Sequence, residues 1–248
     1  GMAVVGIAFG IGMLLGPAIG GTASKWNWAE SFPGMAAFGF NPFSFPAAIA
    51  FVLALINLVW FAARYKETLP EEKRHKAPET KGALARITGL FGISHPQIKQ
   101  VCMAYLLFML AFSGIEFTIA FLVAERFNFV PHQTGYLFVY IAFWLLIAQG
   151  VLVRRLAPKV GEKKLALAGV ACGVVAFVAI ALAHTLPLML IAMAFFSFAV
   201  GLVSPTLSSL VSLYASNSEQ GRYLGTFRSA GSLARAIGPL LAAFGYFS

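Results

Sequence analysis

Long apolar runs separated by polar connections cover almost the whole chain. The runs span about residues 2–21, 45–64, 100–124, 134–153, 165–183, 186–213 and 223–247. Roughly 20 apolar residues in helical form cross the hydrocarbon core of a bilayer, whereas strands of a membrane barrel are only about 10 residues long. Because a backbone in lipid must satisfy its own hydrogen bonds, the pattern predicts an all-α membrane protein, a polytopic bundle of about seven transmembrane helices.

The composition agrees with a chain whose solvent is lipid. The 248 residues are 59% hydrophobic and only 11% charged, whereas soluble domains carry roughly a quarter charged residues. A net charge of +9 would suggest nucleic-acid binding in a soluble protein. Here the basic residues gather in short segments between apolar runs, so we interpret them as topology signals and expect no nucleic-acid partner.

The basic residues alternate between successive connections. Residues 64–99 and 154–164 are rich in Lys and Arg and residues 214–222 carry Arg222, whereas the intervening connections carry at most one basic residue each. The positive-inside rule therefore predicts that these three connections are cytoplasmic, in a plasma membrane or a bacterial inner membrane. Residues 65–98 form the longest polar stretch, and their mixed charges and prolines predict a cytoplasmic linker between two helical bundles. A plain tether and a regulatory segment both fit this stretch.

A glycine-rich run, GIAFGIGMLLGPAIGG, opens the chain, and its Gly-Pro pair returns in the later phrase LARAIGPLL. Three of its glycines recur every four residues and share one helix face, which lets a neighbouring helix approach closely. The proline cannot donate to the carbonyl four residues back, so it bends the helix. The residues of this pattern are Gly12, Gly16, Pro17, Gly20 and Gly21 in the first phrase, and Gly238 and Pro239 in the second. They predict close helix packing.

Ionisable residues also stand inside the predicted helices. Glu116 lies well within its apolar run, and an intramembrane carboxylate of this kind either exchanges a proton or is held by one fixed partner. Arg228 and Arg235 are spaced i, i+7 and share a helix face. We expect Arg235 either to pair with a carboxylate, for which Glu116 is the deep candidate, or to face an anionic substrate. Gln149 is a further candidate for the same proton and substrate pathway.

The sequence offers no pattern for metal binding or covalent catalysis. The four histidines lie in or near connections without the spacing of metal ligands. Cys102 and Cys172 lie within apolar runs and are interpreted as small buried hydrophobic residues. No Ser-His-acid or Cys-His set can be recognised, so we expect no enzymatic activity, no metal site and no bound cofactor.

Several phrases resemble one transporter family. The phrase GIGMLLGPAIGG resembles the Gly-Pro signature in the fifth helix of drug–proton antiporters of the major facilitator superfamily. The phrases AERFNFVPHQTGY, QGVLVRRLAPKVGEKKLAL and SPTLSSLVSLYASNSEQGRYLGTFRSAGSLARAIGPLL resemble the second half of bacterial tetracycline–proton antiporters. FSGIEFTIAFLVAERF together with RSAGSLARAIGP is similar to the eukaryotic tetracycline-transporter-like branch.

The resemblance implies that the chain corresponds to about helices five to eleven of a twelve-helix fold. Residues 1–64 would be the last two helices of the N-terminal half, 65–98 the linker between halves, and 99–248 the C-terminal half without its last helix. The chain begins and ends within apolar runs, so we expect it to be a fragment of a longer protein. The two Gly-Pro pairs would be equivalents in the duplicated halves, and the glycine face would act as a gate that prevents leak.

The resemblance also implies a function. We expect a secondary transporter that exports small amphipathic, drug-like or tetracycline-like compounds in exchange for protons by alternating access. The proton gradient would supply the energy, the partners would be the bilayer, the small-molecule substrate and protons, and the full-length protein would be monomeric. Arg154, Arg155 and Gly161 match the family's conserved cytoplasmic loop, without the Asp of its usual Asp-Arg pair. An organic-anion or metabolite carrier of the same fold is one open alternative, and a non-transporting receptor or scaffold is another.

Overall fold

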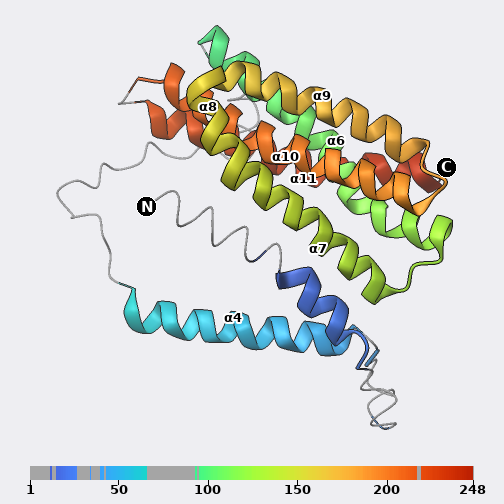
Figure 1. Cartoon of the computed structure of the whole chain (residues 1–248). Helices are drawn as coiled ribbons and strands as arrows, with labels where there is room; N and C mark the ends of the chain where they lie inside the picture. Colours follow the sequence, from blue (N-terminus) through green and yellow to red (C-terminus); the bar gives the residue numbers. More distant parts are fainter. Residues whose placement is uncertain are drawn as a thin grey trace.

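The described part of the chain is helical and contains no strand (Figure 1). The computed structural model describes residues 12, 15–26, 34, 40–41, 43–65, 93, 95–216 and 219–247. The helices are α4 (Ser44–Arg64), α6 (Pro96–Phe127), α7 (Pro131–Ile147), η2 (Ala148–Val153), α8 (Arg154–Val160), α9 (Glu162–Ala181), α10 (Leu186–Tyr214) and α11 (Gln220–Phe247). Residues 15–23 are helical as well. The all-α fold predicted from the apolar runs is confirmed.

Five helical segments in the described residues are long and apolar enough to cross a membrane. They are Ser44–Arg64, Pro96–Phe127, Pro131–Val160, Glu162–Ala181 and Leu186–Tyr214, with a mean hydropathy of 2.1 to 2.4 over their most apolar windows. Helix α11 is comparably long at 28 residues but carries three arginines. The multi-pass membrane character predicted from the sequence is therefore confirmed.

One expected connection is largely helix. The sequence predicts a connection over residues 154–164, but the helix that contains α7 continues without a break to the end of α8. Arg154 and Arg155 lie in α8, because Arg, Leu and Ala all favour helix and nothing at the start of RRLAPKV stops it. Only Gly161 separates α8 from α9, and its φ of 87° is a backbone conformation that glycine adopts without strain.

Two other expected segments lie mainly outside the described residues. Of the first apolar run, residues 12 and 15–21 are described, and they are helical. Of the linker predicted over 65–98, the structure describes residues 65, 93 and 95–98. Pro96 already begins α6 at the first helical position, where its missing N–H removes no helical hydrogen bond.

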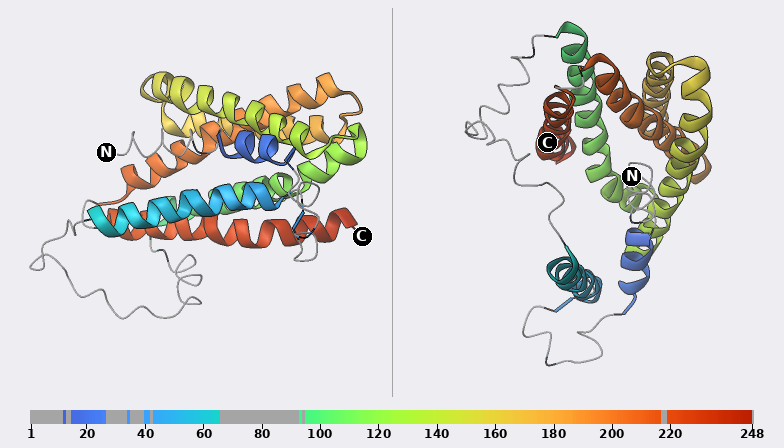
Figure 2. Two further views of the ribbon diagram at one scale, coloured as in Figure 1. Left: turned by 90° about the horizontal axis from the view of Figure 1, so that it is seen from below. Right: turned by 90° about the vertical axis from the view of Figure 1, so that its left-hand side faces the viewer.

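Two helix pairs form the main bundle. Helix α9 packs along α10, α11 packs along α6, and α10 also contacts α6 and α7. A core of buried aromatic and aliphatic side chains joins them and includes Phe112, Met193 and Phe196. Helix α4 lies apart from this bundle in Figure 1 and in the right-hand view of Figure 2, and none of its residues is buried. The bundle of α6 to α11 is therefore the part that can hold a preformed site.

Small residues allow the helices of this bundle to approach closely. A Cβ added at Gly201 on α10 would lie 2.4 Å from the Cβ of Ala148 on η2. A Cβ added at Gly231 on α11 would lie 2.7 Å from the ring of Tyr105 on α6. Both distances are shorter than van der Waals contact, so these two helix crossings depend on the missing side chains.

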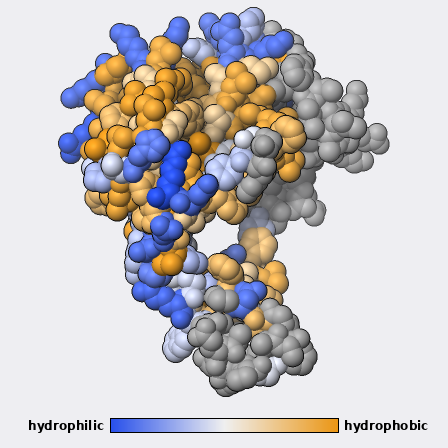
Figure 3. All heavy atoms as spheres, turned by 90° about the vertical axis from the view of Figure 1, so that its right-hand side faces the viewer, coloured by the Kyte–Doolittle hydropathy of each residue, from blue (hydrophilic) through white to orange (hydrophobic). Residues whose placement is uncertain are grey.

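The last turn of α6 fastens one end of the bundle. Arg126 donates through Nη1 to the carbonyl oxygens of Ile180 at 3.1 Å and Ala183 at 3.0 Å, which lie where α9 ends. The neighbouring Glu125 accepts a hydrogen bond from the hydroxyl of Tyr246 on α11. Figure 3 looks onto this end, where hydrophilic side chains are scattered over a largely apolar surface. One helix end is therefore bonded both to α11 and to the turn between α9 and α10.

Candidate transport site

Glu116 lies on α6 beside a small apolar cavity. The cavity is lined from α6 by Phe112, Ile115, Glu116 and Ile119, from α7 by Phe138 and Ile141, and from α10 by Met193 and Phe196. Glu116 is half-buried and precedes the end of α6 by about 11 residues, or roughly 16 Å of helix. Among the described residues, no group makes a hydrogen bond or an ion pair within 4 Å to its carboxylate. A carboxylate at such depth without a fixed partner is free to exchange a proton or a ligand.

Arg235 lies on α11, the helix that packs along α6. Its guanidinium carbon stands 6.0 Å from the ring centroid of Phe112, which is a cation–π contact. Its positive charge also acts favourably on the ionised carboxylate of Glu116, although no direct ion pair joins the two side chains in the described structure. Phe112 therefore belongs both to the cavity beside Glu116 and to the surroundings of Arg235.

A buried hydrogen bond fixes the turn of α11 that carries Arg235. Ser113 Oγ on α6 donates to the carbonyl of Ala234 at 3.1 Å, and both residues are buried. One turn later, a Cβ at Gly238 would lie 1.9 Å from Ser113 Oγ and 2.8 Å from the carbonyl oxygen of Leu110. The Gly-Pro pair of α11 thus marks a close approach of α6 and α11 directly beside the arginine.

Ser113 is a polar position inside an apolar run of the sequence, whereas Phe112 was not predicted as a site residue. Phe112 stands one helical turn before Glu116, so the spacing i, i−4 places both on one face of α6. That spacing was readable from the sequence. The proximity of Arg235 to Phe112 could not be predicted, because α11 follows about 120 residues later and its register against α6 depends on packing. Together Phe112, Ser113, Glu116 and Arg235 form what we call the α6–α11 site.

The first glycine run contacts α7 through its last glycine. A Cβ built at Gly12, Gly16 or Gly20 meets no atom within 4 Å in the described structure, so the predicted close approach on this face is not seen there. Gly21 instead faces Gly135 on α7, at 3.1 Å from a built Cβ to the Gly135 Cα. The contact is made one residue after Gly20, the last of the regularly spaced glycines. The position of the neighbouring helix, and not the spacing alone, decides which glycine it contacts.

Other candidate residues lie outside the α6–α11 site. Arg228 is exposed on α11, and Gln149 is half-buried in η2, a π-helical turn. Neither makes a side-chain hydrogen bond or ion pair to Glu116 within the described ranges. Arg154 and Arg155 are exposed at the far end of the α7–α8 helix. The structure therefore brings Glu116 and Arg235 together and leaves the remaining polar candidates apart from them.

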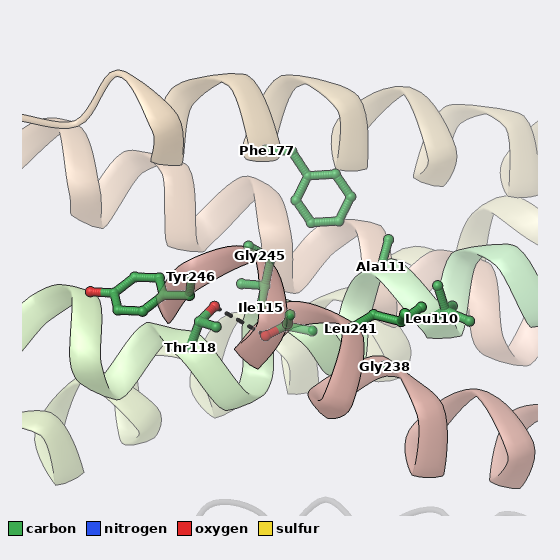
Figure 4. A pocket seen from close by; sticks show the side chains of 11 residues that line it. Leu110, Ala111, Ile115, Thr118, Phe177, Gly238, Leu241, Gly245 and Tyr246 are labelled. Carbon is green, nitrogen blue, oxygen red and sulfur yellow. Dashed lines mark hydrogen bonds between the residues drawn. The ribbon is translucent and has the colours of Figure 1, made fainter. Parts of the chain in front are cut away.

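A second hollow runs between α6 and α11, on a surface without charged side chains. This groove has a volume of about 510 Å³, and Figure 4 labels Ala111, Leu241 and Phe177 among its lining residues. Its hydroxyl groups are those of Thr118 and Tyr246, and Thr118 donates to the carbonyl of Gly114 on its own helix at 3.0 Å. The groove is therefore apolar and lacks a group that recognises charge. The described residues also contain no cluster of His, Cys, Asp or Glu suited to a metal ion.

Comparison with known proteins identifies the family. The model of the Major Facilitator Superfamily matches residues 1–239 of the chain. The chain belongs to the Major Facilitator Superfamily. Within this superfamily, it is 32% identical to mouse and human major facilitator superfamily domain-containing protein 10, over 100% of the chain and 54% of each relative. It is 26% identical to multidrug resistance protein 2 of Bacillus subtilis, over 97% of the chain and 56% of that protein.

A solved structure gives the same assignment. The crystal structure of the human organic anion transporter MFSD10 (TETRAN) superposes with a TM-score of 0.72 and 30% identity, over 98% of this chain and 57% of that one. This major facilitator chain thus spans a little over half the length of the relatives it matches. The tetracycline-type antiporter branch expected from the sequence stays a prediction.

Proposed function

We propose that the protein containing this chain is a secondary carrier of small organic anions that works by alternating access. The observation that supports it is that Arg235 lacks an acidic partner. This exposed residue of α11 contacts the Phe112 ring through its guanidinium, and no carboxylate lies within 4 Å of it in the described structure. A cation without an internal partner inside a membrane bundle is suited to a mobile anionic ligand. The relative solved as an organic anion transporter supports the same substrate class.

The aromatic contact favours anions that also carry an apolar body. Arg235 offers a planar set of donors that suits a carboxylate or sulfonate, while Phe112, Phe138 and Phe196 line the adjoining cavity with rings. A small aromatic carboxylate matches both features, because its charge binds the guanidinium and its ring packs on the phenylalanines.

Glu116 supplies a route for proton coupling. Its ionised carboxylate and an anionic substrate would both be attracted to Arg235, so the two negative charges oppose one another. Protonation of Glu116 removes this competition and strengthens anion binding. Substrate anion and proton therefore bind together, and by linkage a proton gradient directed inward favours anion uptake.

The decisive experiment measures flux in proteoliposomes that contain the full-length protein. Uptake of a radiolabelled aromatic carboxylate is measured with and without an inward proton gradient, for the wild type, Arg235→Gln, Glu116→Gln and the control Lys99→Gln. Removal of a charge-assisted hydrogen bond of about 1.5–3 kcal/mol predicts a KM about 10- to 100-fold higher for Arg235→Gln. Glu116→Gln keeps uptake but loses its dependence on the gradient, and Lys99→Gln behaves as the wild type.

A second candidate function is export of drug-like cations or neutral compounds in exchange for protons. It is favoured by the carboxylate of Glu116, which has no hydrogen bond or ion pair to another described residue, since a cation and a proton would compete for that group and so travel in opposite directions. The same vesicles distinguish the candidates. Transport of a lipophilic cation in the direction opposite to proton flow, without carboxylate transport, would refute the anion carrier. Ligand binding without any transport would refute both carriers and would favour a receptor.

A further inference from the structure

Five basic side chains gather where α8 meets α9. Arg154, Arg155 and Lys159 belong to α8, and Lys163 and Lys164 belong to the first turn of α9. All five are exposed, and only Gly161 and its neighbours separate the two groups along the chain. We call these residues the basic corner.

The charge of the basic corner is not balanced within the described structure. None of its five cations lies within 4 Å of a described carboxylate, and the ion pair between Arg222 and Glu219 stands elsewhere. The nearest acidic residue in sequence, Glu162, accepts a hydrogen bond from Ser209 Oγ on α10 at 3.3 Å. Lys163 and Lys164 also lie at the N-terminus of α9, where the helix dipole is already positive. Within the described residues, this positive charge is therefore unpaired and open to an anionic ligand.

The length of the helix places the basic corner at headgroup depth. Helix α7 begins at Pro131 and continues through η2 and α8, and Arg154 follows Pro131 by about 23 residues. At 1.5 Å per residue this is roughly 35 Å of helix, or about 32 Å along the bilayer normal at a tilt of about 20°. The hydrocarbon core is about 30 Å thick, so with Pro131 at one edge of the core Arg154 and Arg155 lie just beyond the other edge, where the headgroup region begins.

Exposed apolar side chains adjoin the basic corner on both helices. Val151 on the first helix, and Leu167 and Val170 on α9, are between 41% and 62% exposed. Exposed valine and leucine side chains within a membrane span suit contact with acyl chains. The basic side chains therefore stand at the upper edge of a surface that lipid tails cover, and their flexible stems can extend along it.

We propose that the basic corner binds the phosphate of an anionic phospholipid in the leaflet at this end of the bundle. The acyl chains pack on the exposed valines and leucine, and the headgroup phosphate is held by the arginines of α8 and the lysines of α9. Arginine binds phosphate through paired donors, and each basic residue near a charged membrane surface contributes about fivefold to binding. The positive-inside rule predicts that this leaflet is the cytoplasmic one, where anionic lipids are enriched.

The test compares phospholipids that share acyl chains and differ in headgroup charge. Full-length protein in detergent micelles is titrated with phosphatidylglycerol or phosphatidylcholine, and bound lipid is counted by native mass spectrometry. The variant Arg154→Gln/Arg155→Gln/Lys159→Gln removes three charges of the basic corner. The control Lys25→Gln/Lys99→Gln/Arg222→Gln removes three charges elsewhere and so has the same net charge.

We expect phosphatidylglycerol to bind the wild type and the control in preference to phosphatidylcholine. The corner variant should lose this preference by on the order of 100-fold, from about fivefold per charge. Thermal unfolding in phosphatidylcholine micelles checks that it is folded, and Lys163→Gln/Lys164→Gln provides a second variant with an expected loss of about 25-fold. Unchanged lipid preference in both corner variants, an equal loss in the control, or displacement of the lipid by millimolar inorganic phosphate would overturn the proposal.

Discussion

Gly238→Ala tests the packing that holds Arg235 in place. The new Cβ would stand 1.9 Å from Ser113 Oγ and 2.8 Å from the carbonyl oxygen of Leu110. Rotation of Ser113 relieves the first clash only. The second involves backbone, and an ordinary contact of about 3.4 Å therefore requires α11 to move away from α6 by roughly 0.6 Å.

The expected loss of stability in Gly238→Ala has two contributions. Overpacking of a well-packed contact costs about 1–3 kcal/mol, and loss of the buried bond from Ser113 to Ala234 adds about 1 kcal/mol. We therefore expect a destabilisation of roughly 2–4 kcal/mol, or a Tm about 5–15 °C lower. The displaced Arg235 should also reduce anion transport in vesicles more than the loss of stability alone explains.

The matched control is Gly225→Ala on the same helix. A Cβ at this position meets no atom within 4 Å in the described structure, so only helix propensity changes. Alanine then gains about 0.5–1 kcal/mol over glycine. Thermal unfolding of the full-length variants, followed by size-exclusion chromatography after heating, measures both effects. If Gly238→Ala unfolds at or above the temperature of Gly225→Ala, the close approach of α6 and α11 is not the constraint that we describe.

Two further substitutions test the bundle. Gly201→Ala should cost about 1–3 kcal/mol of stability because its Cβ would meet that of Ala148. Adding Ala148→Gly to the same chain should recover most of this loss. A double variant no more stable than Gly201→Ala alone would contradict this contact. Arg126→Met should cost about 2 kcal/mol and speed amide exchange at the turn after α9, because bonds from the guanidinium to its carbonyls are lost. Arg126→Lys should lie between wild type and Arg126→Met, and unchanged exchange in Arg126→Met would refute the role of these bonds.

The apolar runs predicted most helices well, because hydrophobic length is a property that lipid imposes on every span. The run at 186–213 became α10 at Leu186–Tyr214, and the run at 45–64 became α4 at Ser44–Arg64. The connection over 154–164 was mispredicted because charge marks the edge of the bilayer and does not end a helix. Helix α8 simply continues beyond the apolar run.

Some features of the site could be predicted from the sequence and others could not. Depth within an apolar run singled out Glu116 and Arg235 without any structure, since ionisable groups are rare there. The same reasoning could not predict the partner of Ser113, which is a backbone carbonyl on a helix about 120 residues away. It also could not predict that the first glycine run meets α7 through Gly21, because the periodicity fixes which residues share a face but not which helix covers them.

The π-helical turn η2 has a consequence for how this helix is compared with others. Its hydrogen bonds span one residue more than those of an α-helix, so η2 holds one residue that a regular turn would not need. Compared with a continuous α-helix, the side chains after Ala148–Val153 are consequently rotated by about 100° about the helix axis relative to those before it. A helical wheel that treats Pro131–Val160 as one regular α-helix therefore misplaces the side chains on one side of η2. A deletion of one residue inside η2 would restore the ordinary phase while leaving both flanking helices in place. An alignment gap in this helix belongs at η2, where a change in length can be absorbed.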